Sequence, residues 1–353
     1  MSVAASRHAV RPQPQISQLP DVYTGYGRQV GLTWTADTAG ADWLKGRLDS
    51  PWQGTMHDVV PRGFPAYVRI FHPAYRDRPV GTTWPPLPVQ RHRQAWRAFE
   101  QSGPQIETQT ATWTQTAAAM GTAVHPLVQW TALVAPGHTD ATHGTFGHDG
   151  WRYHRPPEGD LDAPTLSRTA AHLSSYTSTP TDGFVAVWDG WGGLLGFEAD
   201  TPARLLLQSG TEVDPQHTAM LSRSLPEQFR GIFARKHWWR GALSDQISHG
   251  PRLALPGRHH VLFSGGIDTF LDPDWIRAMP WHHHDDPAPL EHSPSLIWPS
   301  DRTWVVVTDI DADSTIIAGP AALIQAITTD PELDSAAITA GAAPYTCADG
   351  DST

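Results

Sequence analysis

Apolar residues along the chain recur with two spacings, one typical of strands and one typical of helices. Residues 66–71 alternate apolar and polar side chains, which predicts a strand that ends at His72-Pro73. The run from Phe184 to Trp188 is apolar throughout and ends at Asp189-Gly190, which predicts a buried strand followed by a turn. Further strands are predicted at 203–207, 260–263, 304–308 and 315–318.

Helical spacing marks other segments. Thr112 is placed to cap a helix that Gly121 ends. The shared face of this helix would consist of Trp113, Thr116, Ala117 and Met120. A second helix is predicted from residue 163, with Leu166, Ala170 and Leu173 on one side, and a third after Gly319-Pro320, ending at Asp330-Pro331. Shorter helices are predicted at 42–48 and 125–130, and long loops at 76–90 and 136–163.

The order of these elements predicts the fold class. Strands are interrupted by helices without a regular alternation, which indicates an α+β fold with an antiparallel or mixed sheet, packed helices and many Pro/Gly-rich loops. The chain has 353 residues and shows neither an internal repeat nor a clear linker, so we expect a single domain over residues 21–340. Residues 1–20 and 341–353 are predicted to be disordered tails.

Charge and cysteine content narrow the range of partners. The net charge is −11 and no local run of Lys or Arg offsets it, which argues against binding to nucleic acid or to an anionic membrane surface. No segment is apolar over the about 18 residues that a membrane helix needs, and the N-terminal segment lacks the apolar centre of a signal peptide. We therefore expect an acidic, soluble, cytoplasmic protein. Cys347 is the single cysteine, which excludes an intrachain disulfide.

The segment Ser264-Gly265-Gly266-Ile267-Asp268-Thr269 follows an apolar strand and resembles the phosphate-binding loop of PP-loop ATP pyrophosphatases. In that family, glycines let backbone N–H groups approach the phosphates of a nucleotide. The resemblance implies a cofactor site at Ser264, Gly265, Gly266 and Asp268. However, Asp272-Pro273 interrupts the chain where a helix should follow, so a strand that ends in a Gly-Gly turn is the alternative interpretation.

Two further patches suggest metal chemistry. Asp309, Asp311 and Asp313 follow a predicted strand, and their spacing resembles the nucleophile motif of haloacid-dehalogenase-type phosphatases, in which carboxylates lie near Mg²⁺. Their simpler interpretation is a polar turn, and the sequence favours a site where they meet residues 298–302. His282 and His284 belong to a His/Asp-rich stretch whose residue types suit Zn²⁺ but whose spacing matches no known zinc motif. A solvated loop is the alternative there.

Several segments together resemble one family. The matching residues lie at 60–73, 113–117, 125–126, 184–192 and 293–315. They resemble an uncharacterised family of actinobacterial proteins to which no activity is assigned. The resemblance spans most of residues 59–335 and implies one domain. In that family a Gly-Pro pair commonly replaces Gly265-Gly266, which implies that the Ser-Gly-Gly match is accidental.

The sequence therefore leaves two functions open. The first is a non-catalytic binding or interaction protein that engages a protein partner through a surface rich in tryptophan, of which the chain has 16. The Trp188–Trp191 and Trp238–Trp239 pairs are candidates for such a surface. The second is an enzyme, either ATP-using and PP-loop-like or a metal-dependent hydrolase. No intact catalytic constellation is visible, so the first function is preferred and no cofactor is assigned.

Overall fold

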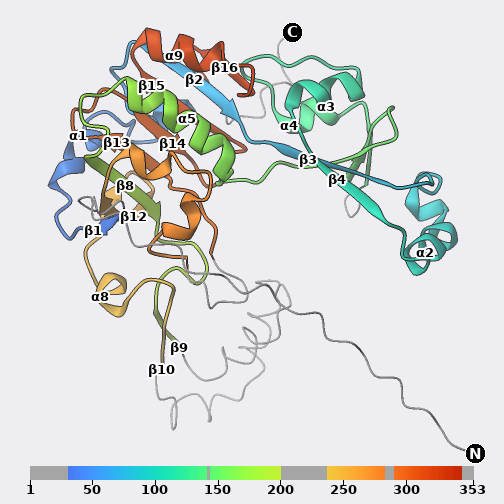
Figure 1. The fold of residues 1–353 in the computed structure, drawn as a ribbon, viewed down its shortest axis with the longest axis horizontal. Helices are drawn as coiled ribbons and strands as arrows, with labels where there is room; N and C mark the ends of the chain where they lie inside the picture. Colours follow the sequence, from blue (N-terminus) through green and yellow to red (C-terminus); the bar gives the residue numbers. More distant parts are fainter. Residues whose placement is uncertain (1–30, 141–143, 200–236, 283–289, 344–353) are drawn as a thin grey trace, which may run out of the picture. The chain divides into compact units, whose positions relative to one another are not determined.

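Strands from distant parts of the chain pair into one large antiparallel sheet (Figure 1). The computed structural model describes residues 31–140, 144–199, 237–282 and 290–343, which belong to one compact unit. The nine-stranded sheet has the order β1-β12-β8-β13-β14-β15-β2-β16, and β11 also pairs with β12. Its strands are β1 (Thr33–Trp34), β2 (Ala66–Phe71), β8 (Gly183–Trp188), β11 (Leu253–Leu255), β12 (Arg258–Ser264), β13 (Leu296–Pro299), β14 (Val305–Thr308), β15 (Ser314–Gly319) and β16 (Ser335–Ile338). The α+β prediction with an antiparallel sheet is confirmed.

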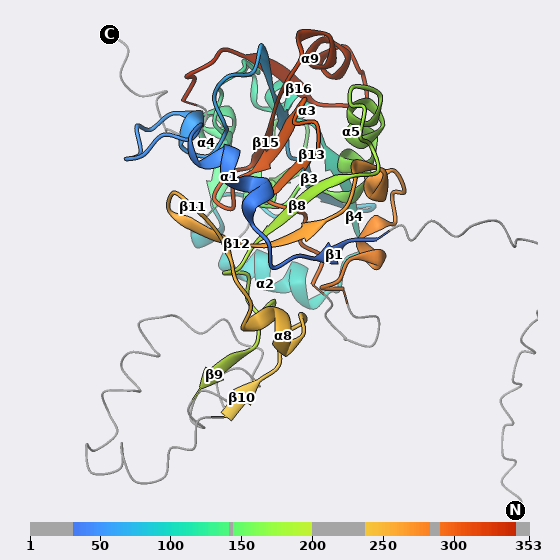
Figure 2. The same cartoon turned by 90° about the vertical axis from the view of Figure 1, so that its left-hand side faces the viewer.

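Both faces of this sheet are apolar and both are covered. Helices α5 (Ala163–Ser175) and α9 (Ala321–Thr328) lie on one face (Figure 2), together with the 3-10 helices Ile267–Phe270 and Trp275–Ala278. The short helix α1 (Asp42–Lys45) and the 3-10 helices Ala39–Ala41 and Met56–Asp58 cover the other face. Two-sided cover explains why Val305, Val306 and Val307 of β14 are all buried although their side chains alternate between faces.

A second sheet is connected to the first by an unbroken stretch of chain. Strand β2 continues through His72-Pro73 into β3, which belongs to a five-stranded antiparallel sheet of order β4-β3-β7-β6-β5. Its strands are β3 (Ala74–Pro79), β4 (Ile106–Ala111), β5 (His138–Asp140), β6 (Gly144–Phe146) and β7 (Arg152–His154), accompanied by α2 (Arg93–Gln101), α3 (Trp113–Met120), α4 (Trp130–Val134) and the 3-10 helix Val89–Arg91. A separate apolar core, built around Phe71, Trp113 and Trp130, fills the space between this sheet and α3–α4.

A short ribbon extends from the end of β8. Strands β9 (Phe197–Ala199) and β10 (His237–Trp239) pair antiparallel, and α8 (Asp245–Ser248) follows. The backbone of residues 242–243 also bonds to residues 193–194, so the ribbon is anchored to the loop that follows β8.

Segments with a clear period fold as predicted. Strand β2 has the predicted bounds, and α3 begins at a capping box of Thr112 and Gln115 and ends at Gly121, whose φ is 72°. Helix α5 buries Leu166, Ala170 and Leu173 as predicted. Helices α1 and α9 and strands β8, β12, β14 and β15 are also confirmed, within a few residues.

Three other predictions are wrong. The predicted loop 76–90 begins with most of β3, and the predicted loop 136–163 contains β5, β6 and β7. The helix predicted at 125–130 begins only at Trp130. These strands lack an alternating apolar pattern, because charged residues such as Asp77 of β3 and Arg152 of β7 pair with each other across the sheet.

Some predictions fall at or beyond the limits of the described residues. The strand predicted at 203–207 and the tail 1–20 lie outside them. Residues 341–343, the start of the predicted C-terminal tail, are described. Gly341 N–H donates to His57 Nε2 at 3.0 Å, and Ala342 is buried in the apolar core on the α1-covered face of the large sheet.

Gly266 is required by close packing, which leads to a testable prediction. Its φ of −95° suits any residue, but a Cβ there would collide with Pro180 O and the backbone of Thr181. We expect Gly266→Ala to lower the free energy of unfolding by about 1–3 kcal/mol, because backbone cannot yield as a side chain does. Urea denaturation measures this. Gly46→Ala is the control, since no atom lies within 4 Å of its Cβ position. Equal stability of the two variants would contradict the packing argument.

Candidate functional site

The Ser264–Asp268 segment bonds to the start of β8 and to the residues just before it. Gly265 N–H donates to Gly183 O at 3.0 Å and Asp268 N–H donates to Pro180 O at 3.1 Å. A phosphate loop would instead present unbonded N–H groups ahead of a full helix. Here a 3-10 helix of four residues follows. The geometry of these residues therefore gives the predicted nucleotide site no support.

The three aspartates after β14 are held by two different arginines. Asp309 and Asp311 both accept bonds from Arg258 Nη2, at 3.1 and 2.7 Å. Asp313 pairs with the buried Arg69 at 3.2 Å. Among the described residues, no group of three or more His, Cys, Asp or Glu side chains is arranged to hold a metal ion. Residues 298–302 do not meet these aspartates, because the two turns lie at opposite ends of β14.

The predicted histidine ligands lie at the edge of the described chain. His282 follows Trp281, and its N–H donates to Met279 O at 3.0 Å. His284 lies in 283–289, outside the described residues. A metal site that includes these histidines therefore stays a prediction.

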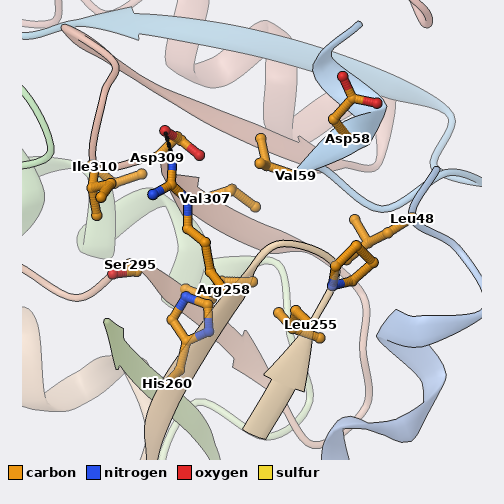
Figure 3. A pocket seen from close by; sticks show the side chains of 13 residues that line it. Leu48, Asp58, Val59, Leu255, Arg258, His260, Ser295, Val307, Asp309 and Ile310 are labelled. Carbon is orange, nitrogen blue, oxygen red and sulfur yellow. Dashed lines mark hydrogen bonds and ion pairs between the residues drawn. The ribbon is translucent and has the colours of Figure 1, made fainter. Parts of the chain in front are cut away.

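Asp309 faces a small cavity at the end of the large sheet, whose lining is mainly apolar (Figure 3). The cavity lies between the β11–β12 hairpin, the start of β13 and the end of β14, and Arg258, His260 and Ser295 help to line it. Within the described structure, His260 Nδ1 and Arg258 Nε have no hydrogen-bond partner. Burial lowers the pKa of His260 to about 3, with a further contribution from the charge of Arg258, so the imidazole is neutral at pH 7.

The size of this cavity decides what it can do. Its volume is about 30 Å³. One water molecule occupies about 30 Å³ of liquid, so the cavity has room for a water and not for an organic substrate. Burial raises the pKa of Asp309, an effect that the bond from Asp311 N–H and the charge of Arg258 oppose. We interpret this corner as a polar anchor of the β14–β15 turn.

His72 forms a second buried polar group, at the junction of the two sheets. Its Nδ1 lies 2.8 Å from Pro157 O, which can only accept, so Nδ1 carries the hydrogen. Its Nε2 therefore accepts from the Thr315 hydroxyl at 3.0 Å, which in turn accepts from Thr308 at 2.8 Å. Burial lowers the pKa of His72 to about 4. Both ring nitrogens of His72 and the hydroxyls of Thr315 and Thr308 thus have internal partners, so this series of hydrogen bonds stabilises the fold.

Arg69 on β2 is the third buried polar group. Its Nε donates to Ser314 Oγ at 2.8 Å and its Nη1 to Val128 O at 2.8 Å, in addition to the pair with Asp313. The guanidinium also lies 5.4 Å from the ring centroid of Trp113. These contacts tie the large sheet to α3 and to the loop before α4.

A much larger pocket lies on the second sheet, where β3 ends and β6 turns into β7. Its volume is about 470 Å³, within the range of about 300–1,000 Å³ typical of ligand sites. Its apolar walls are Pro79, Trp84, Pro85, Leu87 and Phe146. Arg78, Thr82, Thr83 and Asp149 supply polar groups.

The main wall of this aromatic pocket is fixed in place. The guanidinium of Arg152 lies 4.1 Å from the centroid of Trp84, and Trp96 stacks at 5.9 Å with an interplanar angle of 15°. Arg152 is held in turn by Asp77, with Nε–Oδ1 and Nη2–Oδ2 distances of 2.8 and 2.6 Å. Burial raises the pKa of Asp77, but bonds from Arg152 and His154 outweigh it and bring the value to about 2. Trp84 therefore packs against the ion pair of Arg152 and Asp77, which stays charged near pH 7.

The two charged side chains at the aromatic pocket already have internal hydrogen-bond partners. Arg78 pairs with Glu107 at 2.9 Å. Asp149 accepts from Tyr153 Oη at 2.8 Å and from Trp151 N–H at 3.1 Å. By contrast, no described residue bonds to the hydroxyls of Thr82 and Thr83. The pocket thus offers an aromatic wall, two available hydroxyls and two charged side chains that already hold internal bonds.

Sequence reasoning missed this pocket. Trp84-Pro85-Pro86 lies in a segment that was predicted as a loop, and no role was predicted for Trp96 and Phe99 of α2. One signal was available, namely a tryptophan beside two prolines and ahead of an amphipathic helix. The partner wall Phe146 comes from a three-residue strand and carried no such signal.

The two tryptophan pairs noted in the sequence are packed by nearby histidines. Trp188 and Trp191 contact edge to face at 5.4 Å, and Trp191 stacks on His292 at 3.7 Å. Trp238 stacks on His249 at 4.3 Å, and its Nε1 donates to Asp245 at 2.7 Å. These rings support the fold around the loop after β8.

Comparison with known proteins adds no relative. Neither protein-family models, curated proteins nor solved structures gave a match. Among the described helices, none has the length and apolar character needed to cross a membrane.

Proposed function

We propose that this chain is a non-catalytic binding protein that takes a neutral, ring-bearing group of a protein partner into the aromatic pocket. The carrying observation is the contrast between two of its pockets, about 30 Å³ of water-sized space beside Asp309 and about 470 Å³ beside Trp84. The cytoplasmic location expected from the sequence stays part of this proposal.

The chemistry of the pocket supports a neutral ring as its occupant. Trp84 and, to a smaller extent, the largely buried Phe146 line the pocket with aromatic surface, on which proline and aromatic rings pack well. A charged ligand would have to share Arg78 with Glu107 and Asp149 with the Tyr153 hydroxyl, whereas a neutral ring leaves these bonds intact. Because Trp84 is fixed by Arg152 and Trp96, a ligand would not need to order the wall, which favours affinity.

A titration with small neutral rings tests this proposal. N-acetyl derivatives of prolinamide, tyrosinamide and tryptophanamide are added in turn while NMR follows the indole signal of Trp84, which Trp84→Phe identifies. We expect a saturable shift with at least one of them and none with N-acetylalaninamide. Thr83→Arg should weaken binding at least tenfold, because it fills the pocket from an exposed rim position.

The matched control is Trp52→Phe, which alters a tryptophan that is 50% exposed and does not line the pocket. It should bind the same compound within about twofold. Binding that survives Thr83→Arg would contradict the proposal. So would a specific enzymatic turnover that disappears on Asp311→Asn or Asp313→Asn.

A further inference from the structure

Arg302 occupies a backbone conformation that normally favours glycine. Its φ is 57°, and no other non-glycine residue in the described chain has a positive φ. Arg302 N–H donates to Pro299 O at 2.9 Å, which closes the turn between β13 and β14. The left-handed position after such a turn is usually glycine, since a Cβ there is strained. An arginine that persists in a strained position suggests that its side chain has a use.

The turn is held firmly enough to maintain this strain. The Asp301 carboxylate accepts from Thr177 Oγ at 2.7 Å, from Ser178 N–H at 2.7 Å and from Thr303 Oγ at 2.6 Å. These bonds hold the pKa of Asp301 well below its usual range although burial opposes them. The carboxylate is thus committed to the turn, and it does not pair with Arg302.

The Arg302 side chain instead reaches a tryptophan on the short helix α1. Its guanidinium lies 5.8 Å from the ring centroid of Trp43, and that of Arg47 lies 5.3 Å from the same ring. Trp43 is itself positioned by edge contacts with Phe64 and Trp298, each at 6.3 Å. Two segments of the chain, residues 43–47 and the turn at Arg302, therefore bring two guanidiniums to one aromatic ring.

These two arginines differ from the other cations around them. Lys45 pairs with Asp42 at 2.9 Å, and Arg62 pairs with Asp49 at 2.6 Å. Arg47 and Arg302 are both exposed, and neither has an acidic partner in the part of the chain that the structure describes. Both guanidiniums are therefore free of a neighbouring carboxylate on a protein whose net charge is −11.

We propose that Arg47 and Arg302, positioned by Trp43, bind a small oxyanion, that is, a carboxylate or phosphate group of a ligand. A guanidinium presents N–H donors in a planar fork that matches the geometry of both groups. The ring of Trp43 limits the freedom of the two side chains, which lowers the entropy lost on binding. This site is separate from the aromatic pocket and would stand if the neutral-ring proposal failed.

An NMR titration with defined anions tests the site. Sodium phosphate and sodium citrate are titrated separately at ionic strength fixed with sodium chloride, and the indole signal of Trp43 is followed after assignment with Trp43→Phe. We expect a saturable shift with at least one of the two anions and none with chloride alone. The tighter anion identifies a phosphate or a carboxylate as the natural group.

Variants separate binding from folding. Arg302→Gly and Arg47→Gln should each weaken binding at least tenfold, whereas Arg97→Gln, an exposed arginine on α2, should change it less than twofold. The urea midpoint of Arg302→Gly should equal or exceed that of the parent, because glycine relieves the strained φ. Unchanged anion binding in Arg302→Gly would overturn the proposal. A lower urea midpoint would also overturn it, since Arg302 would then serve the fold.

Discussion

Replacing Arg69 with methionine should lower the free energy of unfolding by about 3–5 kcal/mol. The side chain has no exposed surface, and its loss leaves Asp313 and Val128 O without their buried partner. Methionine fills much of the volume, so the effect reports the lost polar contacts rather than a cavity. Urea denaturation at pH 7 measures it.

A double variant separates the ion pair from the other contacts of Arg69. Burial raises the pKa of Asp313, an effect that Arg69 opposes, so the arginine makes the charged form tolerable. Asp313→Asn removes the charge that Arg69→Met would leave unpaired. We expect the double variant to be more stable than the sum of the single effects predicts, by about 1 kcal/mol or more. Arg97→Met, on the exposed side of α2, should stay within about 0.5 kcal/mol of the parent. A change below 1 kcal/mol for Arg69→Met would contradict the role given to this residue.

As the pH falls, the protein should lose stability well before its ion-paired carboxylates become protonated. His72 should contribute strongly to this loss. The pKa of His72 is about 4 in the folded state, against about 6.5 for an unperturbed histidine. Below pH 6.5 the unfolded chain takes up a proton that the folded chain refuses, so stability falls until about pH 4. The difference of about 2.5 pH units corresponds to about 3 kcal/mol from this residue.

His72→Gln isolates this contribution. Glutamine does not titrate, so the stability lost between pH 7 and pH 4.5 should be smaller in the variant by about 2–3 kcal/mol. At pH 8 the variant should be less stable than the parent by about 1–3 kcal/mol, because a hydrogen bond to Pro157 O or Thr315 is lost. His260 acts in the same sense, and the buried Asp309 and Asp313 act in the opposite sense. These groups are present in both proteins and largely cancel in the difference. Parallel pH profiles would show that His72 does not titrate as proposed.

The strands and helices that could be predicted are those whose pattern lies within a short stretch of sequence. The alternation in β2, the cap and terminal glycine of α3 and the apolar stripe of α5 each lie within a few residues. The second sheet has no such signal. Arg76, Asp77 and Arg78 in β3 read as loop residues, and only pairing with residues such as Arg152, far along the chain, makes them a strand.

The candidate site was harder to predict, for the same reason. The spacing of Asp309, Asp311 and Asp313 suggested shared chemistry, but it carried no information about the arginines that face them. Arg258 lies on β12 and Arg69 on β2. Arg258 pairs with Asp309 and Asp311, whereas Asp313 pairs with Arg69. The aromatic pocket combines Trp84 from a proline-rich loop with Phe146 from another strand, a juxtaposition that no local pattern encodes.

Site-specific photo-crosslinking in the native host tests the central claim most directly. A benzoylphenylalanine placed at Thr83, on the rim of the aromatic pocket, should give a discrete crosslinked product with one partner protein. The same probe at Trp52, which is exposed but does not line the pocket, should not give that product. Crosslinking to the same protein from both positions, or to none from Thr83, would contradict the claim that this pocket holds a partner.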